Sequence, residues 1–528
     1  MAAKNALISV FDKTNVAELA KQLSDLGWNI FSSGGTAKAI AKADVKVTDV
    51  ADMTGLPAIL GHRVVTLHPK VHGGILAIPD DKEHQKDMSE YDIHPFGLVV
   101  GNLYPFNDEP SVEMIDIGGP AMVRAAAKNH AYVGVLTNPS EYPKIIKELK
   151  ANGTLSDDTR KSLAIEAFAH TANYDLSVVE WLSDGRYTGS LGQKVQDCDY
   201  GENRWQSPAA LYSEVDSSDM LNVPKFKTIK GRSPSFINWT DVDRLLLTLT
   251  QAIAIRRLNG LDQKVYIAVA VKHGNPCGAA VASTPEDALK NMLEGNPRAV
   301  FGAVMMTNFK LDKDHAELLM HHGMPPKQRR LLDGICAPQF SAGAVEILGR
   351  KDGKYFLATN PELAKLDKGS IDENAMIRPV RGGFLSQPAY RPTAVLDKDQ
   401  KSSLSDQQLD DILLGIAVCA TSNSNTVTLV KNGMIIGNGV GQQDRVGCCE
   451  LAIKLATDNG HDIQGSTAVS DSFFPFPDGP ELLINSGVST IFATSGSKKD
   501  GDTQQLCQDR NVTLVQIPDA VARMFFRH

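Results

Sequence analysis

Residues 265–283 read VYIAVAVKHGNPCGAAVAS, and this stretch decides the fold class of the second half of the chain. An alternating run of β-branched and small apolar residues predicts a strand that ends at Lys272, and a turn rich in glycine and proline follows. Lys272 and His273 therefore sit at a strand end, where active sites of α/β proteins are commonly built. A lysine there can stabilise an oxyanion, and a histidine can exchange a proton near neutral pH.

The same pair also has a purely structural explanation. A solvated lysine beside a histidine that hydrogen-bonds the turn would give the same octapeptide. The segment alone does not decide between the two interpretations.

The composition describes a globular chain of 528 residues, 42% of them hydrophobic, so we expect at least two domains. Its 54 lysines and arginines and 62 aspartates and glutamates leave a formal charge of -8, which excludes a long basic groove for nucleic acid. Small anionic ligands need only a few local cations, so they remain possible.

Cysteine usage and hydropathy bear on the compartment. The seven cysteines are scattered and odd in number, which indicates a reducing environment rather than a disulfide framework. No apolar window of about 18 residues occurs, and the N-terminus leads directly into a strand. We expect a cytoplasmic protein that binds neither membranes nor nucleic acid.

The first 50 residues alternate between strand and helix patterns. We expect a strand at 6–10, a helix at 15–26, a strand at 28–31 and a further helix opened by Ser33, Gly34, Gly35 and Thr36. This alternation predicts a parallel sheet. The Gly-Gly turn offers backbone N–H groups to a phosphate, although such turns are also common as tight connections.

Later segments complete this first domain. Strands are expected at 98–100 and 132–136, and a helix over 157–182 closes the domain. Residues 185–207 lack periodicity and are rich in Gly, Asp and Asn, which predicts an irregular inter-domain connection.

Residues 61–74, GHRVVTLHPKVHGG, concentrate histidines and cations. Zinc is one hypothesis, with His62, His68 and His72 as ligands. It is disfavoured because the segment is extended and has neither an HExxH motif nor a cysteine pair. A better interpretation is that Arg63 and Lys70 face a phosphate bound at the Gly-Gly turn.

The stretch IDIGGPAMVRAAAKNH, residues 115–130, places Asp116 before a second Gly-Gly turn. Arg124 and Lys128 are four residues apart on the helix that follows, so both cations lie on one face. Alone, this pattern is more typical of a surface helix with a capped start.

Two units of the second half resemble each other loosely. Residues 265–283 and 425–443 are each a strand ending in lysine, a turn and a second strand. The pattern predicts a duplicated subdomain, although common hairpin chemistry can produce it by chance.

Eleven motifs occur in one order along nearly the whole chain, and each taken alone is a weak signal. Together they resemble the bifunctional purine-biosynthesis enzymes that pair phosphoribosylaminoimidazolecarboxamide (AICAR) formyltransferase with inosine monophosphate (IMP) cyclohydrolase. The motifs are SSGGT, RVVTLHPKVHGGIL, NLYPF, IDIGGP, RAAAKNH, YGEN, KHGNPCG, VFGA, SNSN, GVGQQDRV and SDSFFPF.

The resemblance implies an α/β fold with two domains. Residues 1–190 would form an IMP cyclohydrolase domain like methylglyoxal synthase, and residues 191–528 an AICAR formyltransferase domain of two cytidine-deaminase-like subdomains. Zinc deaminases need a Pro-Cys-x-x-Cys motif, whereas Cys277 is followed by Gly, Ala and Ala. The resemblance therefore extends to the fold and not to a zinc site.

For formyl transfer, the resemblance implies that the 5-amino group of AICAR attacks the formyl carbon of 10-formyltetrahydrofolate. His273 would assist proton removal, Lys272 would stabilise the oxyanion, and Asn425 would hydrogen-bond an amide or formyl oxygen. Substrate contacts would come from Tyr200, Gly201, Phe301 and Gly302.

For ring closure, the carboxamide nitrogen attacks the new formyl group and water is lost, so positioning supplies most of the acceleration. The resemblance implies that Tyr104, Asp116 and Lys128 surround the reacting groups. The substrate would be bound by Ser33, Gly34, Gly35, Thr36, Arg63, Thr66 and Lys70.

The sequence departs from the family pattern at several charged positions. Val65 stands where the family has a lysine, Asp199 replaces a basic residue, Trp205 a histidine, and Pro477 an arginine. Lys70 and Arg204 are the nearby cations that could compensate.

The resemblance further implies a homodimer, small-molecule substrates (AICAR, its formylated product, IMP and folate) and no zinc, and it leaves a bound monovalent cation open. Two alternatives remain at this point. One is an enzyme that retains only one of the two activities, and the other is a catalytically weak purine-nucleotide-binding protein.

Overall fold

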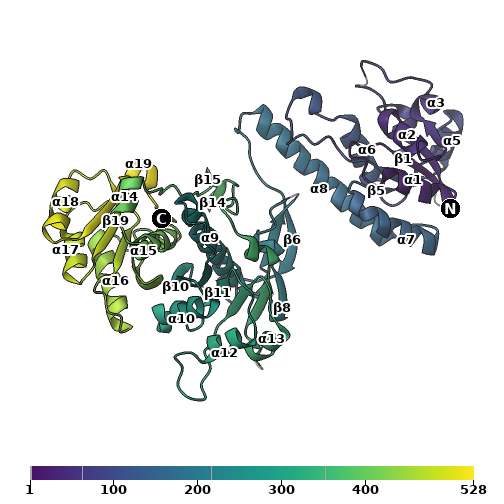
Figure 1. Ribbon diagram of the computed structural model, residues 1–528. Coiled ribbons are helices and arrows are strands. Elements are labelled where there is room, and N and C mark those ends of the chain that lie inside the picture. Colours follow the sequence, from purple (N-terminus) through teal and green to yellow (C-terminus); the bar gives the residue numbers. More distant parts are fainter. Residues whose placement is uncertain (1–2, 62, 216, 351–352, 528) are drawn as a thin grey trace. The chain divides into compact units, whose positions relative to one another are not determined.

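The computed structural model describes residues 3–61, 63–215, 217–350 and 353–527. They form two compact units (Figure 1). Unit 1 contains residues 1–193 and 214–217, and unit 2 contains residues 194–213 and 218–528. Within the described part of the chain, no helix is both long and apolar enough to cross a bilayer.

Unit 1 is built on a five-stranded parallel sheet in the order β3-β2-β1-β4-β5. The strands are β1 (Asn5–Ile8), β2 (Asn29–Ser32), β3 (Val47–Asp49), β4 (Leu98–Val100) and β5 (Gly134–Leu136). The central strands are buried along their length, as expected for strands covered by helices on both faces. The predicted alternation of strands and helices is confirmed.

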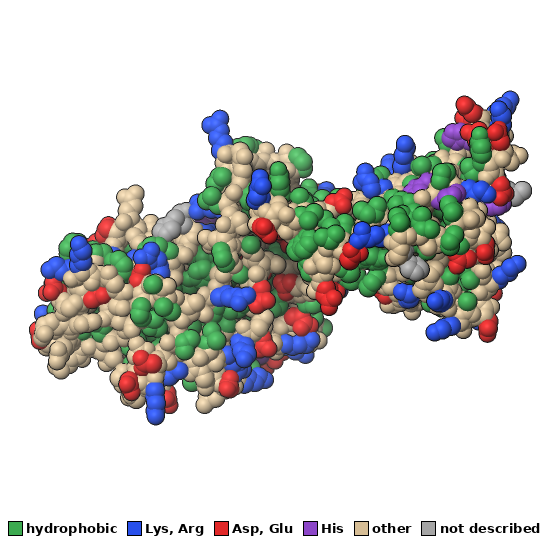
Figure 2. Space-filling view, turned by 90° about the horizontal axis from the view of Figure 1, so that it is seen from above, with side chains coloured by type: hydrophobic (Ala, Val, Ile, Leu, Met, Phe, Trp, Pro, Cys, Tyr) green, Lys and Arg blue, Asp and Glu red, His purple; other side chains and the backbone are tan. Residues whose placement is uncertain are grey.

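The helices of unit 1 are α1 (Val16–Asp25), α2 (Gly34–Ala41), α3 (Val50–Thr54), α4 (Pro69–Leu76), α5 (Lys82–Glu90), α6 (Gly118–Lys128), α7 (Tyr142–Asn152) and α8 (Asp157–Leu182). Helices α1 to α6 connect the parallel strands, and α7 and α8 follow the last strand. The long helix α8 begins where the Ser156 side chain accepts the N–H of Thr159, and it packs against α6 and β5. Figure 2 shows hydrophobic side chains, in green, on the surface of the molecule, and the exposed ones of α8 include Ile165 and Leu182.

Unit 2 is built on a mixed sheet of eleven strands in the order β20-β19-β18-β16-β17-β10-β9-β11-β12-β13-β8. In sequence order the strands are β8 (Lys227–Gly231), β9 (Tyr266–Lys272), β10 (Asn275–Ala282), β11 (Val304–Thr307), β12 (Gly334–Ala337), β13 (Phe356–Thr359), β16 (Val427–Lys431), β17 (Met434–Gly439), β18 (Thr467–Ser470), β19 (Thr490–Ser495) and β20 (Thr513–Pro518).

The sheet of unit 2 contains two copies of one pattern. β9 lies between antiparallel β10 and β11, and β11, β12 and β13 run parallel. β16 repeats this arrangement with β17, β18, β19 and β20. The copies join where β10 pairs with β17. The predicted duplication is therefore confirmed.

The residues of β9 explain how its two faces are covered. Ile267, Val269 and Val271 enter a core with helices α9 (Phe236–Leu258) and α15 (Asp406–Cys419). Ala268 and Ala270 face a second core with helices α10 (Pro285–Gly295) and α12 (Lys313–His321). Alternation of large and small side chains thus places one helix layer on each face.

The remaining elements of unit 2 are short or peripheral. The helices are α11 (Pro297–Val300), α13 (Ala342–Leu348), α14 (Lys398–Ser402), α16 (Arg445–Asp458), α17 (Asp478–Asn485), α18 (Asp500–Asp509) and α19 (Asp519–Ala522). Two separate hairpins are β14 (Met376–Val380) with β15 (Gly383–Gln387), and β6 (Gly192–Asp197) with β7 (Ala210–Glu214).

The segment 185–207, where the inter-domain connection is expected, contains strand β6, which the sequence did not predict. All but one of the β6 side chains are exposed, so the strand has no alternation of apolar and polar residues for the sequence to reveal.

Candidate active sites

A cavity of about 780 Å³ opens in unit 1 beyond the carboxyl end of strand β1. Its walls combine the end of β1, the turn before α2, the segment around Arg63 and the start of α6. Parallel sheets build ligand sites at this edge. Of the predicted residues, the cavity is lined by Ser33, Gly34, Gly35, Thr36, Arg63, Thr66, Tyr104 and Asp116.

The Gly-Gly turn before α2 forms part of the cavity wall. Gly34 has φ 55°, in the left-handed region, and Ser33 is the extended residue before the first turn of α2. The Thr36 hydroxyl donates to Val10 O at 3.0 Å, so it anchors the turn to the end of β1. The exposed backbone of Gly34 and Gly35 remains available to an anion.

Lys13 is a cation of this cavity that the sequence prediction missed. A Cβ built on Gly35 would lie 3.6 Å from Lys13 Cε, and the ammonium donates to Phe11 O at 3.1 Å. The lysine therefore stands beside the turn that offers N–H groups. Its position after a short strand in VFDKT was the only signal, and that signal is common.

Asp116 and Tyr104 form the acid–phenol pair of the cavity. The Asp116 carboxylate accepts the N–H of Gly119 at 2.9 Å, and a Cβ on Gly119 would lie 2.4 Å from Asp116 Oδ2, so only glycine fits there. Burial raises the pKa of Asp116, although backbone hydrogen bonds act against it. Burial and the Asp116 charge both raise the pKa of Tyr104.

A second phenol fixes the backbone at this point. The Asp116 N–H donates to the Tyr174 hydroxyl at 2.7 Å, and that hydroxyl donates to Met114 O at 2.7 Å. Tyr174 lies on α8, so the long helix holds the loop before α6 in place. The sequence prediction did not include Tyr174 because a tyrosine in a helix carries no specific signal.

Three cations were predicted to bind substrate in this cavity, and their observed contacts differ from that prediction. Arg63 forms an exposed ion pair with Glu113, which also lines the cavity. Lys70 pairs with Asp92 at 3.0 Å, and Lys128 is exposed at the last residue of α6, whereas the cavity contains the first two residues of that helix. Neither lysine lines the cavity.

The described histidines of the same region have structural surroundings. His68 caps α4 by accepting the Lys70 N–H at 3.1 Å, and burial lowers the pKa of His72. His62 lies outside the described residues. Across the part of the chain that the structure describes, no cluster of three or more His, Cys, Asp or Glu side chains could hold a metal ion.

In unit 2, Lys272 and His273 occupy the hairpin between β9 and β10. Lys272 is the last strand residue and pairs with Asn275, while His273 (φ 53°) and Gly274 (φ 74°) both have left-handed backbone. This two-residue turn matches the twist of its strands. The Asp241 carboxylate of α9 accepts the Gly274 N–H at 2.8 Å and so holds the turn.

The turn between β16 and β17 has the same construction. Asn432 (φ 53°) and Gly433 (φ 71°) form it, and the Asp411 carboxylate of α15 accepts both backbone N–H groups, that of Gly433 at 2.6 Å. The second copy of the duplicated unit thus has the clamp without a histidine.

The side chains of Lys272 and His273 diverge. The Lys272 ammonium donates to Phe301 O at 2.7 Å, and a Cβ on Gly302 would lie 3.6 Å from it. The predicted residues Phe301 and Gly302 therefore adjoin the lysine. His273 instead lines a second cavity, of about 880 Å³, to which Lys272, Phe301 and Gly302 do not contribute.

Asp333 is a further residue that the sequence prediction missed. It precedes β12, and burial raises its pKa against the opposing charges of Arg232, Arg350, Lys272 and His273. The carboxylate is therefore within electrostatic reach of both predicted catalytic residues, which makes it a candidate for the same site. In the sequence it is one aspartate before a glycine, which also fits an ordinary turn.

Asn425 is held by its own network. Its Nδ2 donates to Gln442 O at 3.0 Å, and its Oδ1 accepts from Arg445 Nη2 at 3.1 Å. Arg445 is ion-paired with Asp471, which is fully buried and also accepts the Ser424 hydroxyl at 2.6 Å. Arg445 and Asp471 were not predicted as site residues.

The segment that departs from the family pattern lies close to the start of α9. Tyr200 accepts the N–H of Phe236 at 2.9 Å, and a Cβ on Gly201 would lie 2.8 Å from Gln206. Asp199 pairs with Arg232 at 3.5 Å, and Trp205 is 80% exposed. Tyr200 and Gly201 therefore shape this turn, and neither lines the cavity.

These features define an α/β protein with one candidate active site in each unit. Unit 1 offers a phosphate-type turn with an acid and a phenol, and unit 2 offers a lysine and a histidine on a clamped hairpin. Comparison with known proteins identifies the family.

The chain belongs to the AICARFT/IMPCHase bienzyme family, whose model matches residues 126–455. A model for the MGS-like domain matches residues 15–130. A bifunctional purine biosynthesis protein PurH of Persephonella marina is 35% identical over 97% of this chain and 98% of its own length. The PurH protein of Rhodopirellula baltica is 36% identical over 99% of both chains.

Among solved structures, the crystal structure of ForH is 36% identical to this chain, with a TM-score of 0.33, and covers 35% of this chain and 98% of its own. The family prediction and the predicted fold class are confirmed. The chain is an enzyme with AICAR formyltransferase and IMP cyclohydrolase activities, the last two steps to IMP. Formyl transfer implies a donor of the folate type.

Proposed function

We propose that ring closure takes place in the cavity of unit 1, that formyl transfer takes place at the β9–β10 turn of unit 2, and that 10-formyltetrahydrofolate is the donor. The observation that carries this division is the clamped turn. His273 is held in left-handed backbone by Asp241, and its side chain lines a cavity large enough for a nucleotide.

For formyl transfer, the 5-amino nitrogen of AICAR attacks the formyl carbon and its proton passes to His273. For Lys272 to stabilise the negative charge that develops on the formyl oxygen, its ammonium leaves Phe301 O and turns toward the cavity that His273 lines. The bond from the formyl carbon to the folate nitrogen then breaks, and that nitrogen takes up a proton. Asn425 donates or accepts a hydrogen bond to the reacting groups, with Arg445 holding its amide in one orientation.

For ring closure, the carboxamide nitrogen attacks the formyl carbon of the same molecule and water leaves. Asp116 and Tyr104 exchange the protons that the nitrogen releases and the departing oxygen needs. The raised pKa of Asp116 favours its protonated form, which can donate a proton to the departing oxygen. The 5′-phosphate is held by the turn of Ser33 to Thr36, with Arg63, Thr66 and Lys13 around it. Roles for Lys70 and Lys128 stay predictions.

No step is assigned to zinc, because the residue three positions after Cys277 is Ala280 and not a second cysteine. Burial also raises the pKa of the Cys277 thiol to about 12, so it stays protonated. The place of a monovalent cation stays a prediction.

We further propose that the enzyme is a cytoplasmic homodimer. The β14–β15 hairpin supports a dimer because it carries exposed apolar side chains outside the cavity, among them Val380 and Phe384. Seven free cysteines support a reducing compartment. Sedimentation velocity tests the dimer, and a monomer at micromolar concentration would contradict it.

One assay tests the proposed reactions. The enzyme is given AICAR and 10-formyltetrahydrofolate, and tetrahydrofolate, formylated intermediate and IMP are followed together. We expect tetrahydrofolate and IMP to rise in equal amounts. Accumulated intermediate would contradict a working cyclohydrolase, and absence of tetrahydrofolate would contradict this donor.

A further inference from the structure

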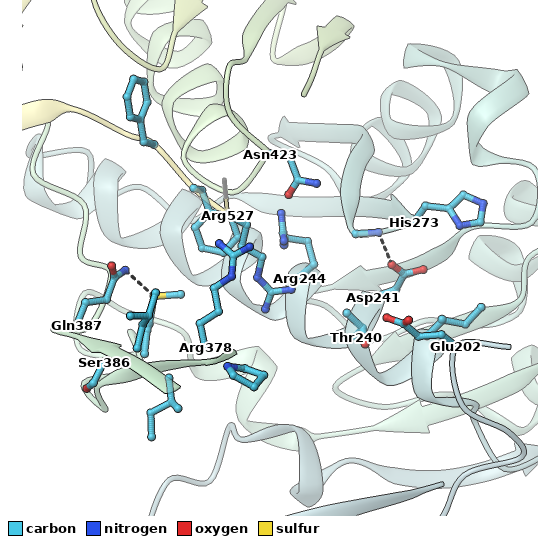
Figure 3. A pocket seen from close by; sticks show the side chains of 18 residues that line it. Glu202, Thr240, Asp241, Arg244, His273, Arg378, Ser386, Gln387, Asn423 and Arg527 are labelled. Carbon is cyan, nitrogen blue, oxygen red and sulfur yellow. Dashed lines mark hydrogen bonds between the residues drawn. The ribbon is translucent and has the colours of Figure 1, made fainter. Parts of the chain in front are cut away.

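The cavity that His273 lines in unit 2 has two chemically different ends. His273, Asp241 and Glu202 lie at one end, and three arginines gather at the other, as Figure 3 shows. Arg244 comes from α9, Arg378 from the β14–β15 hairpin and Arg527 from the C-terminal segment. Elements far apart in the sequence therefore bring three guanidinium groups to one place.

The aromatic ring of Phe526 lies close to the guanidinium groups of two of these arginines. The guanidinium carbons of Arg244 and Arg527 lie 4.3 and 5.6 Å from the centroid of its ring. Arg244 is 2% exposed and donates to Thr421 O. Burial, together with the neighbouring Arg527 charge, lowers the pKa of Arg244 to about 10, so it stays charged at neutral pH.

The cluster has more positive charge than its own contacts neutralise. Arg527 pairs with Asp243 at 3.6 Å, which is a long contact between partly exposed groups. Within the described residues, Arg378 has no hydrogen-bond or ion-pair partner. A convergent set of donors with an unpaired guanidinium is the arrangement that recognises phosphate or carboxylate groups.

The segment where the family pattern places its cation cannot serve this end of the cavity. Asp199 is a carboxylate engaged with Arg232, and the Arg204 guanidinium lies 5.7 Å from the Tyr200 ring centroid. Neither Asp199 nor Arg204 lines the cavity. Among its described lining residues, Arg244, Arg378 and Arg527 are the arginines, and no lysine is present.

We propose that Arg244, Arg378 and Arg527 bind the 5′-phosphate of the ribonucleotide in the transferase site of this chain, in place of the basic residue that Asp199 replaces. The assignment rests on the function proposed above, because it puts the amino group of the same ribonucleotide at the His273 end. The carboxylates of the folate donor share the anion chemistry and are the competing source.

The test uses the full-length enzyme with Arg378→Ala and Arg527→Gln, because both side chains are exposed while Arg244 supports the core. We expect each variant to raise the KM for AICAR ribonucleotide by about tenfold or more. The KM for 10-formyltetrahydrofolate and the kcat/KM for the nucleoside without phosphate stay unchanged. Arg381→Ala, on the turn of the same hairpin and outside the cavity, is the matched control.

Two results would overturn the assignment. A raised KM for folate with an unchanged KM for the ribonucleotide would show that the arginines bind the donor. A raised ribonucleotide KM in Arg204→Ala but not in Arg378→Ala would return the phosphate to the turn around Tyr200.

Failure of the proposed function gives a different result, since the wild type would then release no tetrahydrofolate. In that case, calorimetric titration with the ribonucleotide still tests whether the arginines bind its phosphate. We expect the ribonucleotide to bind the wild type at two sites and Arg378→Ala at one, whereas equal binding to both proteins would refute the phosphate site.

Discussion

The Asp241 carboxylate accepts a hydrogen bond from the Gly274 N–H at 2.8 Å, and this contact joins helix α9 to the turn that carries His273. Under the proposed function, Asp241 is a positioning residue for formyl transfer. We expect Asp241→Ala to lower kcat by about 10- to 100-fold, because a small displacement of a reacting group has such effects. Asp241→Asn retains an acceptor oxygen and should recover most of the rate. Equal losses in both variants would contradict a positioning role.

His273→Ala removes the proposed proton acceptor. Formyl transfer should fall by about 100-fold or more, since positioned acid–base groups contribute at least that much. Ring closure of supplied intermediate should not change, because it belongs to the other unit. His321→Ala, a partly exposed histidine of unit 2, is the control. Loss of both activities in folded His273→Ala protein would refute the division between units.

The pH dependence of stability tests the environment of Asp116. Burial raises its pKa in the folded protein, whereas the unfolded chain titrates near its ordinary value of about 4. As pH rises through this window, the unfolded state loses its proton first, so the folded state becomes less favoured. Asp116→Asn lacks this titration.

We therefore expect the melting temperature of wild-type unit 1 to fall, relative to that of Asp116→Asn, between about pH 4 and pH 7. Calorimetry at both pH values measures the difference. The variant should also lose ring closure. A constant difference in melting temperature across the window would mean that Asp116 titrates normally.

Val65 lines the unit 1 cavity where the family pattern has a lysine. We expect Val65→Lys to lower the KM of the cyclohydrolase for its formylated substrate by about threefold to tenfold, because the added cation faces a phosphate in a partly exposed site. Leu60→Lys adds the same charge at a residue that is 72% exposed and outside the cavity. The same decrease in both variants would show only a long-range effect of charge.

Arg445 is the buried partner of Asp471 and orients Asn425. Arg445→Ala should cost about 3–5 kcal/mol of unfolding free energy in unit 2, because it leaves a buried carboxylate unpaired. It should also slow formyl transfer. The double variant Arg445→Met with Asp471→Asn should recover stability but not rate, as denaturant unfolding and the coupled assay can measure. Recovery of the rate would contradict a role for Arg445 in holding Asn425.

The sequence was most informative where local chemistry and long-range order coincide. The strand that ends at Lys272, the Gly-Gly turns and the duplicated hairpins each follow from periodicity and turn residues, and the structure contains all of them. The collinear motifs identified the family because their order is improbable by chance.

The missed residues share a physical reason. Lys13, Asp333 and Arg244 are brought to their sites by tertiary contacts, and nothing in their local sequence distinguishes them from ordinary surface or turn residues. Strand β6 was missed because nearly all of its side chains are exposed. Pattern reasoning detects faces that become buried, and it cannot detect charges that meet only after folding.

The second clamped turn has a consequence for how this fold can evolve. Asn432 has the backbone conformation of His273, and Asp411 holds it as Asp241 holds the first turn. Asparagine and histidine both tolerate left-handed backbone, so either residue can occupy either turn without a change of main chain. Duplication has therefore left one chain with two turns that are held in the same way, so a reactive side chain can be selected at the second turn while the first keeps its proposed role.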